Sequence, residues 1–244
     1  MANTTFACKE FVIHQDQCAM KVTTDACLFG AWTCQETTDI HQDPLKILDI
    51  GAGTGLLTLM LAQQFSNAHF TGVELDTSAA QQATINCAQS PWNDRIAIEQ
   101  GDILQFSSTS LFDLIISNPP FYESDLKSPS TKKNWAFHDQ GIKLGQLLIR
   151  INELLAPGGL FFLLLPPRRD ADLFHWCNYT QLQLLKCCSV QPTSQKPMSR
   201  VFYQGCKSNP SALPPTYSTL TVQGNISGYS PAAFQLLSPY YFSL

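Results

Sequence analysis

The sequence lacks the long apolar segments that would attach it to a membrane. Its 244 residues contain no run of about 18 uncharged apolar residues, which is close to the length that crosses a bilayer as a helix. Lys9 and Glu10 stand near the amino terminus, where a signal peptide would have its apolar core. We therefore expect a cytoplasmic protein that has no membrane partner.

Paired cysteine motifs are also missing, although cysteine itself is not. The nine cysteines are an odd number at scattered spacings without a Cys-x-x-Cys pair, and the adjacent Cys187 and Cys188 have poor geometry for a metal. Disulfide frameworks and structural metal sites need paired, regular spacings. We expect reduced thiols that serve as small apolar residues, and no metal.

Acidic residues are absent from the end of the chain, because no Asp or Glu follows Asp172. Residues 1–126 carry 15 acidic and 4 basic side chains, whereas residues 127–244 carry 4 acidic and 11 basic ones. The net charge of −4 does not by itself suggest a nucleic-acid partner. A basic face formed by the second half would suit a polyanion; the alternative is a chance distribution over a solvated surface.

Strand-like and helix-like segments alternate along most of the chain. Short apolar runs typical of buried parallel strands alternate with segments of helical periodicity, such as the helix expected from Leu144 to Leu155. This alternation predicts an α/β fold with helices on both faces of one sheet. The expected strands are residues 46–50, 69–74, 95–99, 112–117, 160–165, 182–190 and 200–206.

These seven strands should form a mostly parallel sheet in a single domain. The last two read as a hairpin-like pair, so one of them should be antiparallel. The expected divisions are an N-terminal lid or extension (1–43), the core (44–206) and a C-terminal strand and helix (207–244).

The N-terminal extension should contain one strand and one helix. The strand is expected between Phe6 and Ile13, and Thr24 or Asp25 can cap a helix that runs through Trp32. The extension is either a packing lid or a lid that also touches a ligand at the adjacent turn.

A glycine-rich turn joins the first strand of the core to its first helix. Gly51, Gly53 and Gly55 stand at every second position. Glycine lets the backbone turn tightly and a ligand come close, and the helix start offers free N–H groups. Asp49 precedes the glycines, so a phosphate would be repelled there and an ammonium group attracted.

Polar residues also follow the next three strands, at the edge where doubly wound sheets bind ligands. The glycine pattern is G-x-G-x-G, not the G-x-G-x-x-G of dinucleotide folds. Glu74 can hold two ribose hydroxyls, Asp102 can accept from an adenine amine, and Asp49 can orient a cationic amino-acid head directly or through water. An adenine, a ribose and a cationic amino-acid head together describe S-adenosylmethionine.

The tetrapeptide Asn118-Pro119-Pro120-Phe121 resembles the motif of methyltransferases that modify planar nitrogens. An exocyclic amine such as adenine N6 is a weak nucleophile, because its lone pair is delocalised into the ring. The Asn118 side chain and the Pro119 carbonyl can each accept one N–H and aim the lone pair, while Phe121 can stack on the flipped base. The chemistry then depends on positioning and not on a strong base. The alternative is a proline turn that ends a core strand.

Further segments extend this resemblance, which covers roughly residues 6–165. They are Gln15 to Asp25, Leu48 to Leu61, Val73 to Asp76, Gln89 to Trp92 and Ile115 to Tyr122. Together they are similar to the bacterial tRNA1(Val) (adenine(37)-N6)-methyltransferase family. The resemblance implies a Rossmann-like class I methyltransferase fold, S-adenosylmethionine as cofactor and adenine 37 of valine tRNA as target. The chain departs from the pattern at Thr23, where glycine is more usual, and at Phe137, where arginine is expected before His138.

The residues expected to take part in catalysis, cofactor binding or RNA binding form three groups. The catalytic candidates are Asn118, Pro119, Pro120 and Phe121. The cofactor-binding candidates are Lys21, Thr24, Asp49, Gly51, Gly53, Gly55, Glu74, Leu75, Asp102, Ile103 and Asn118. The candidate RNA contacts in the basic half are Lys127, Lys132, Lys133, Arg168, Arg169, Lys196 and Arg200.

The partner expected from this interpretation is a tRNA, bound by a monomeric enzyme. Two rivals remain within enzymes: a glutamine-N5 methyltransferase of a protein substrate, which shares the Asn-Pro-Pro motif, and another rRNA or DNA amino-methyltransferase. A rival of a different class is a non-catalytic RNA-binding protein that keeps the fold. Such a protein would bind RNA without S-adenosylmethionine.

Overall fold

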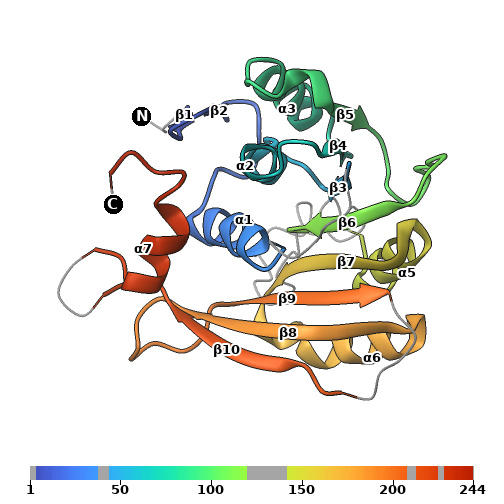
Figure 1. Ribbon diagram of the computed structural model, residues 1–244, viewed down its shortest axis with the longest axis vertical. Helices are drawn as coiled ribbons and strands as arrows, with labels where there is room; N and C mark the ends of the chain where they lie inside the picture. Colours follow the sequence, from blue (N-terminus) through green and yellow to red (C-terminus); the bar gives the residue numbers. More distant parts are fainter. Residues whose placement is uncertain (1–3, 38–43, 120–141, 208–212, 225–227, 244) are drawn as a thin grey trace, which may run out of the picture.

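An eight-stranded sheet forms the centre of the computed structural model (Figure 1). The structure describes residues 4–37, 44–119, 142–207, 213–224 and 228–243. Within them, β9 alone opposes the other strands of this sheet, because it pairs antiparallel with both β7 and β8. The strands, in order across the sheet, are β10 (Thr216–Thr221), β8 (Leu182–Gln191), β9 (Arg200–Lys207), β7 (Leu155–Leu165), β6 (Phe112–Ser117), β3 (Lys46–Ile50), β4 (His69–Glu74) and β5 (Ile96–Gln100).

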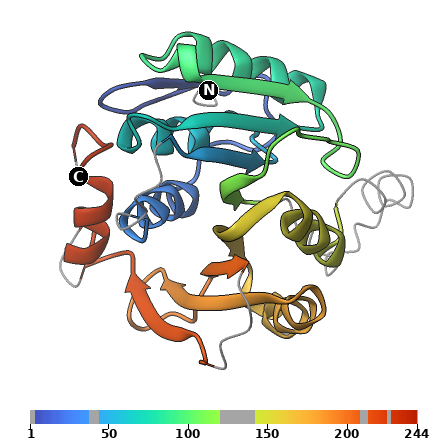
Figure 2. The same ribbon diagram turned by 45° about the vertical axis from the view of Figure 1, so that its right-hand side comes forward.

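Helices cover both faces of this sheet, as Figures 1 and 2 show. In β6, Leu114 and Ile116 pack into one apolar core, whereas Ile115, which lies between them, packs into the other. Successive strand side chains point to opposite faces, so a strand buried between two helical layers is apolar at nearly every position. The first core includes α1 (Thr24–Gln35), α2 (Leu56–Gln64) and α7 (Pro231–Leu237), the second α5 (Leu144–Leu154) and α6 (Asp170–Thr180), and α3 (Thr77–Ala88) packs on β4 and β5. None of the helices described is long and apolar enough to cross a membrane.

The predicted α/β architecture and its single antiparallel strand are confirmed, but the expected count of seven strands is one too few. The C-terminal strand β10 joins the edge of the sheet as an eighth strand. It pairs in parallel with β8, from Thr216 opposite Lys186 to Thr221 opposite Gln191. Strand order across a sheet depends on pairing between distant segments, and a single strand pattern does not encode its partner.

The N-terminal extension differs from expectation in two details. A short antiparallel hairpin of β1 (Thr5–Ala7) and β2 (Val12–His14) replaces the single strand. The helix α1 is capped by Thr23, and not by Thr24 or Asp25, because Thr23 Oγ1 accepts from the N–H of Ala26 at 3.2 Å. A residue with extended backbone and a hydroxyl is a preferred cap.

Two elements of the second half were not predicted correctly. Helix α6 was missed, because its buried residues form one narrow stripe of Leu173, Cys177 and Thr180. Strand β7 begins at Leu155, five residues earlier than expected, and includes the segment Ala156-Pro157-Gly158-Gly159. An irregularity in its pairing with β6 accommodates this extension.

The cysteines behave as the composition suggested. All nine are free and buried. Burial raises the pKa of Cys8, Cys34 and Cys87 to about 12. Thiols with such a raised pKa stay protonated at neutral pH and are inert as nucleophiles, so these side chains contribute packing.

Gly205 provides a test of the packing between β7, β8 and β9. It lies opposite Phe161, and a Cβ built on it would be 2.2 Å from Phe161 Cζ and 2.6 Å from the carbonyl oxygen of Gln183. Neither group can move without disturbing a neighbouring strand. We therefore expect Gly205→Ala to lower the free energy of unfolding by about 1–3 kcal/mol, the usual cost of overpacking.

The measurement is urea unfolding, with Gly101→Ala as the control. A Cβ at Gly101 would meet no atom within 4 Å, so this variant should stay within about 0.5 kcal/mol of the parent. Equal midpoints for both variants would contradict the packing described.

Candidate active site at the carboxyl edge of the sheet

Four strand ends meet at one edge of the sheet. Strands β6, β3, β4 and β5 are neighbours and parallel, with Ile50 opposite both Val73 and Ser117 and Glu74 opposite Gln100. The turn after β3, the end of β4, the turn after β5 and Asn118 after β6 therefore lie side by side. The topology brings together the four polar signals that the sequence placed at separate strand ends.

The glycine turn presents open backbone at this edge. Gly51, Gly53 and Gly55 have φ values of +75°, +56° and +80°, a left-handed conformation that glycine adopts without strain. Among the atoms of the described residues, a Cβ at Gly51 would meet none within 4 Å, and one at Gly53 would approach only the Gly51 carbonyl oxygen, at 3.9 Å. The space over the turn is therefore available to a ligand.

The buried carboxylate of Asp49 supports this turn from below. Its Oδ2 accepts from the backbone N–H of Thr58 at 3.1 Å and from the Thr58 hydroxyl at 2.7 Å. Asp49 is 2% exposed, and its Oδ1 has no hydrogen-bond partner among the described residues. The pKa of Asp49 is raised to about 6, chiefly by burial. The two Thr58 hydrogen bonds act to lower this pKa, and the charge of Glu74 acts to raise it.

Glu74 is fixed by two backbone N–H groups. Its Oε2 accepts from Gly53 at 2.8 Å and its Oε1 accepts from Asp76 at 2.9 Å. The carboxylate thus connects the end of β4 to the middle of the glycine turn. Each carboxylate oxygen has a second lone pair, so Glu74 can also accept hydrogen bonds from a ligand, beside the exposed side chain of Leu75.

Asp102 holds a tight turn after β5. Its Oδ1 accepts from the N–H of Leu104 at 2.9 Å, and its carbonyl oxygen accepts from Gln105 and Phe106, each at 2.9 Å. Ile103 is 7% exposed and packs into the core. The turn therefore holds Asp102 at the edge of the sheet and buries its neighbour.

Asn118 and Pro119 leave β6 at the same edge. Asn118 is half-buried and Pro119 is buried. The preceding residue, Ser117, donates from its hydroxyl to the carbonyl oxygen of Ile50 at 2.7 Å, which ties the end of β6 to the end of β3. The other predicted residues Pro120, Phe121, Lys127, Lys132, Lys133, Phe137 and His138 lie outside the described residues.

The N-terminal extension is attached to the glycine turn through α3. Asn86 donates to the carbonyl oxygens of His14 at 2.8 Å and of Thr54 at 2.9 Å, and it accepts from the N–H of His14. Cys18 of this extension has a pKa raised to about 11 by burial and next by the charge of Glu74. The extension therefore passes close to Glu74.

The predicted contacts in this extension are less central. Lys21 is exposed and its Nζ donates to the carbonyl oxygen of Gln15. Thr24 is half-buried at the first position of α1. Neither side chain has a recorded contact with the glycine turn among the described residues.

The described basic candidates share this edge of the sheet. Arg168 and Arg169 directly follow β7, and Lys196 lies between β8 and β9. Arg200 starts β9, and because β9 is antiparallel its start lies at the carboxyl edge of the other strands. Arg200 Nε lies 3.7 Å from Asp25 Oδ2, and Arg169 Nη1 lies 3.0 Å from Asp172 Oδ2.

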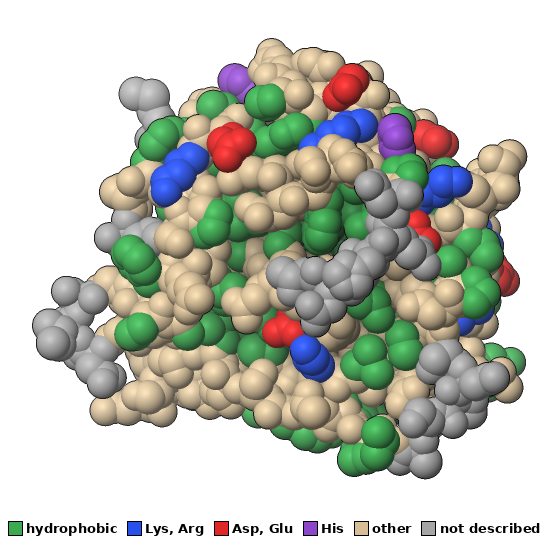
Figure 3. All heavy atoms as spheres, in the orientation of Figure 1, with side chains coloured by type: hydrophobic (Ala, Val, Ile, Leu, Met, Phe, Trp, Pro, Cys, Tyr) green, Lys and Arg blue, Asp and Glu red, His purple; other side chains and the backbone are tan. Residues whose placement is uncertain are grey.

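A basic patch is absent from the described part of the face in Figure 3, where Lys, Arg, Asp and Glu side chains are scattered. This arrangement is that of a solvated surface. The four described basic candidates lie instead along the carboxyl edge of the sheet.

The sequence of this chain was compared with those of known proteins. Residues 35–144 match the family model of the methyltransferase small domain. A Porphyromonas gingivalis tRNA1(Val) (adenine(37)-N6)-methyltransferase is 38% identical over 99% of this chain and 96% of its own length. The enzyme of that name from Vibrio cholerae is 33% identical over 100% and 98%. The chain belongs to the tRNA1(Val) (adenine(37)-N6)-methyltransferase family.

Another relative of the same name, from Dyadobacter fermentans, is 48% identical over 67% of this chain and 66% of its own length. A solved class I S-adenosylmethionine-dependent methyltransferase from Listeria monocytogenes superimposes with a TM-score of 0.62 at 16% identity, covering 92% of this chain and 70% of that one. The family and the fold expected from the sequence are thus confirmed for this member of the tRNA1(Val) (adenine(37)-N6)-methyltransferase family.

Sequence reasoning missed two side chains that this family member uses to build its site. Thr58 carries a weak signal, because it is the third residue of a helix that starts after a glycine and so has an N–H in need of a cap. Asn86 carries none, since its partners His14 and Thr54 lie 72 and 32 residues away. Among the residues described, no three His, Cys, Asp or Glu side chains are grouped to hold a metal ion.

The raised pKa of Asp49 predicts an unusual dependence of stability on pH. The native carboxyl keeps its proton up to about pH 6, whereas the unfolded one releases it near pH 4. The native state therefore binds more protons between these values, and its stability falls as pH rises through them. Below pH 4 the carboxyl is protonated in both states and does not affect the stability. Above pH 6 it is charged in both states, and the native state bears the full cost of burying that charge.

Asp49→Asn removes this term. We expect its stability relative to the parent to rise by about 2–3 kcal/mol between pH 4 and pH 7, since two units correspond to about 2.7 kcal/mol. Urea unfolding of both proteins across that range measures the difference. A constant difference between them would show that Asp49 titrates normally.

Proposed function

We propose that this protein transfers a methyl group from S-adenosylmethionine to N6 of adenine 37 in tRNA1(Val). The observation that carries the proposal is the position of Asn118, which leaves β6 at the edge where the glycine turn, Glu74 and Asp102 also end. Relatives with this activity in their names match nearly the whole chain. The N-terminal extension, core and C-terminal strand and helix act as one catalytic domain.

The residues at this edge fit S-adenosylmethionine. The buried Oδ1 of Asp49 has no partner within the described part of the chain, so it can accept a hydrogen bond from the ligand's ammonium group or from a bridging water. The open backbone at Gly51 and Gly53 leaves room for the chain that bears this group. Glu74 is placed to accept from the ribose hydroxyls.

The adenine end of the ligand fits the next strand ends. Leu75 is 53% exposed beside Glu74 and can cover one face of the ring. Asp102 uses Oδ1 for its own turn, so Oδ2 can accept from the exocyclic amine. Ile103 supplies an apolar boundary.

The residues after β6 would position the acceptor amine. When bound, the cofactor supplies a methyl group on a positively charged sulfur, which becomes a neutral thioether. The Asn118 side-chain oxygen and the Pro119 carbonyl each accept one N–H of the amine, so its lone pair points at the methyl carbon. The nitrogen gains a methyl group and releases one proton. Rate enhancement comes from this alignment and requires no side chain that is a strong base.

The tRNA would approach over the same edge. Arg168, Arg169, Lys196 and Arg200 stand around it, and phosphate contacts from such residues supply sequence-independent affinity. A single-stranded target beside an anticodon can be turned out of its stack into a pocket. In this arrangement the basic second half of the chain contacts the tRNA. The enzyme acts as a monomer in the cytoplasm.

Removal of the Asn118 side chain tests the proposed reaction. Asn118→Ala should lower the rate of N6-methyladenosine formation at least about 100-fold, which is the scale for loss of a positioned polar group. Its affinity for S-adenosylhomocysteine should stay within about threefold. The assay is incubation with labelled S-adenosylmethionine and total tRNA, followed by nucleoside mass spectrometry.

Asn118→Asp is the matched control, because a carboxylate still accepts an N–H and should keep measurable activity. Normal turnover in Asn118→Ala would refute the role of this residue. A parent protein that methylates no tRNA nucleoside would refute the function itself.

Glu74→Ala tests the cofactor site separately. Loss of hydrogen bonds to a charged acceptor should weaken S-adenosylhomocysteine binding by about 1–3 kcal/mol. Calorimetry measures it, with Glu99→Ala as a control that removes the same charge from an exposed position in β5. Equal affinities for the two variants would exclude Glu74 from the site.

A further inference from the structure

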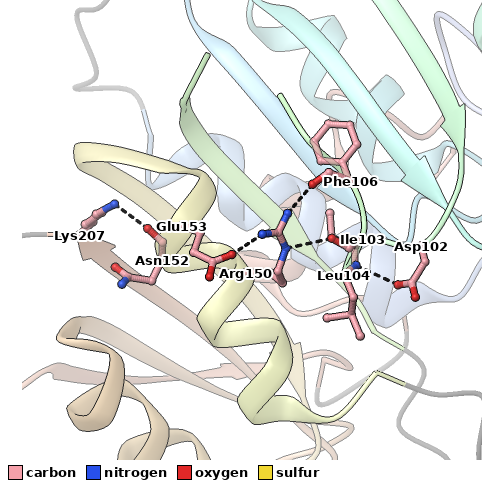
Figure 4. A network of polar contacts seen from close by, with 8 residues as sticks. All are labelled: Asp102, Ile103, Leu104, Phe106, Arg150, Asn152, Glu153 and Lys207. Atoms are coloured by element: carbon pink, nitrogen blue, oxygen red, sulfur yellow. Dashed lines mark hydrogen bonds and ion pairs between the residues drawn. The ribbon is translucent and has the colours of Figure 1, made fainter. Parts of the chain in front are cut away.

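A guanidinium group lies behind the turn that carries Asp102 (Figure 4). Arg150 of α5 donates from Nε to the carbonyl oxygen of Ile103 at 3.0 Å and from Nη2 to that of Phe106. Its Nη1 forms an ion pair with Glu153, one turn further along the helix. The side chain of Arg150 is 17% exposed and that of Glu153 is 51% exposed, so the contacts to the turn are the more protected ones.

Arg150 and Asp102 bind opposite edges of the same peptide unit. The carbonyl of Ile103 and the N–H of Leu104 belong to one planar trans peptide, in which the two groups point in opposite directions. Arg150 Nε donates to that carbonyl, and the N–H donates to Asp102 Oδ1 at 2.9 Å. Rotation of this plane would break both hydrogen bonds together.

The contact to Phe106 holds the other end of the turn. The N–H of Phe106 donates to the carbonyl oxygen of Asp102 at 2.9 Å, while its own carbonyl accepts from Arg150. The guanidinium therefore joins the first and last parts of the turn, and its fixed, planar set of donors suits this use.

The helix behind Arg150 is a firm support. Leu147, Leu148 and Ile151 are fully buried in one core. Lys207 of β9 donates to the carbonyl oxygens of Asn152 and Leu155, where α5 ends and β7 begins. A side chain anchored on such an element positions a site more accurately than a free loop does.

We infer that Arg150 is a positioning residue for adenine recognition, and that it acts by orienting the Asp102 carboxylate through the peptide between Ile103 and Leu104. The inference rests on the proposed role of Asp102. A carboxylate held in place before binding loses less side-chain freedom when the ligand arrives. Removal of the guanidinium should therefore weaken recognition of the exocyclic amine more than binding of the rest of the cofactor.

The test compares two ligands, S-adenosylhomocysteine and S-inosylhomocysteine, by calorimetry. They differ in the exocyclic amine, which inosine replaces with an oxo group that cannot donate to Asp102. The parent should prefer the adenosyl ligand about tenfold or more, the scale of a hydrogen bond to a charged group. Arg150→Met should reduce that preference to about twofold, with affinity for the inosyl ligand within about threefold of the parent.

Two further variants separate the possible explanations. Glu153→Gln removes the ion pair but keeps the contacts of Arg150 to the turn, so it should keep the parent's preference. Arg150→Lys, with one donor group in place of the planar fork, should give an intermediate preference and serves if Arg150→Met fails to fold.

Each outcome has one interpretation. A full preference in Arg150→Met or, where that variant fails to fold, in Arg150→Lys, would overturn the inference while leaving Asp102 in its role. Equal affinity of the parent for both ligands would overturn the role of Asp102 and the inference with it. Loss of binding to both ligands in equal proportion would make Arg150 a general support of the turn and would also refute the inference.

Discussion

The buried carboxylate of Asp49 is the constraint on which the rest of the site depends. A helix that starts after a tight turn has free N–H groups, and a side chain at its N-cap normally binds one of them. Here the N-cap is Gly55, which has no side chain and whose φ of +80° is strained for any other residue. Asp49, six residues earlier, binds the N–H of Thr58 instead. The cost is a desolvated carboxylate, and the consequence is an acceptor oxygen left open beneath the turn.

The same device recurs at the next strand ends. Glu74 accepts from the N–H groups of Gly53 and Asp76, and Asp102 accepts from that of Leu104. Each carboxylate thus fixes the backbone around it, and the backbone in return fixes the carboxylate. Three acidic groups on one sheet edge would repel one another if they were free to move. Held by backbone N–H groups, they form a row of acceptors whose directions exist before any ligand binds, which lowers the entropy lost on binding.

The local sequence pattern predicted the parts of the site that depend on residues close together in the chain. Apolar runs gave the strands of the core, and parallel pairing then placed Asp49, Glu74, Asp102 and Asn118 at one edge without further information. The predictions failed where the structure depends on contacts between residues that are distant in the sequence. The eighth strand depends on a partner in β8, and α6 on a narrow buried stripe. Asn86 and Arg150 looked like ordinary helix residues, because the backbone groups that they hold at the site lie more than 30 residues away.

Helix α5 links two parts of the site that the order of strands in the sheet keeps apart. In the sheet, two strands, β3 and β4, lie between the strand that precedes Asp102 and the strand that precedes Asn118. Arg150 ties the turn of Asp102 to α5, while α5 packs through Leu147, Leu148 and Ile151 into the core that also contains Ile115 of β6. The turn that carries Asp102 and the strand that precedes Asn118 are therefore both attached to this helix. In the proposed reaction, which depends on alignment more than on acid or base strength, this shared support would keep the methyl donor and the amine at a constant separation.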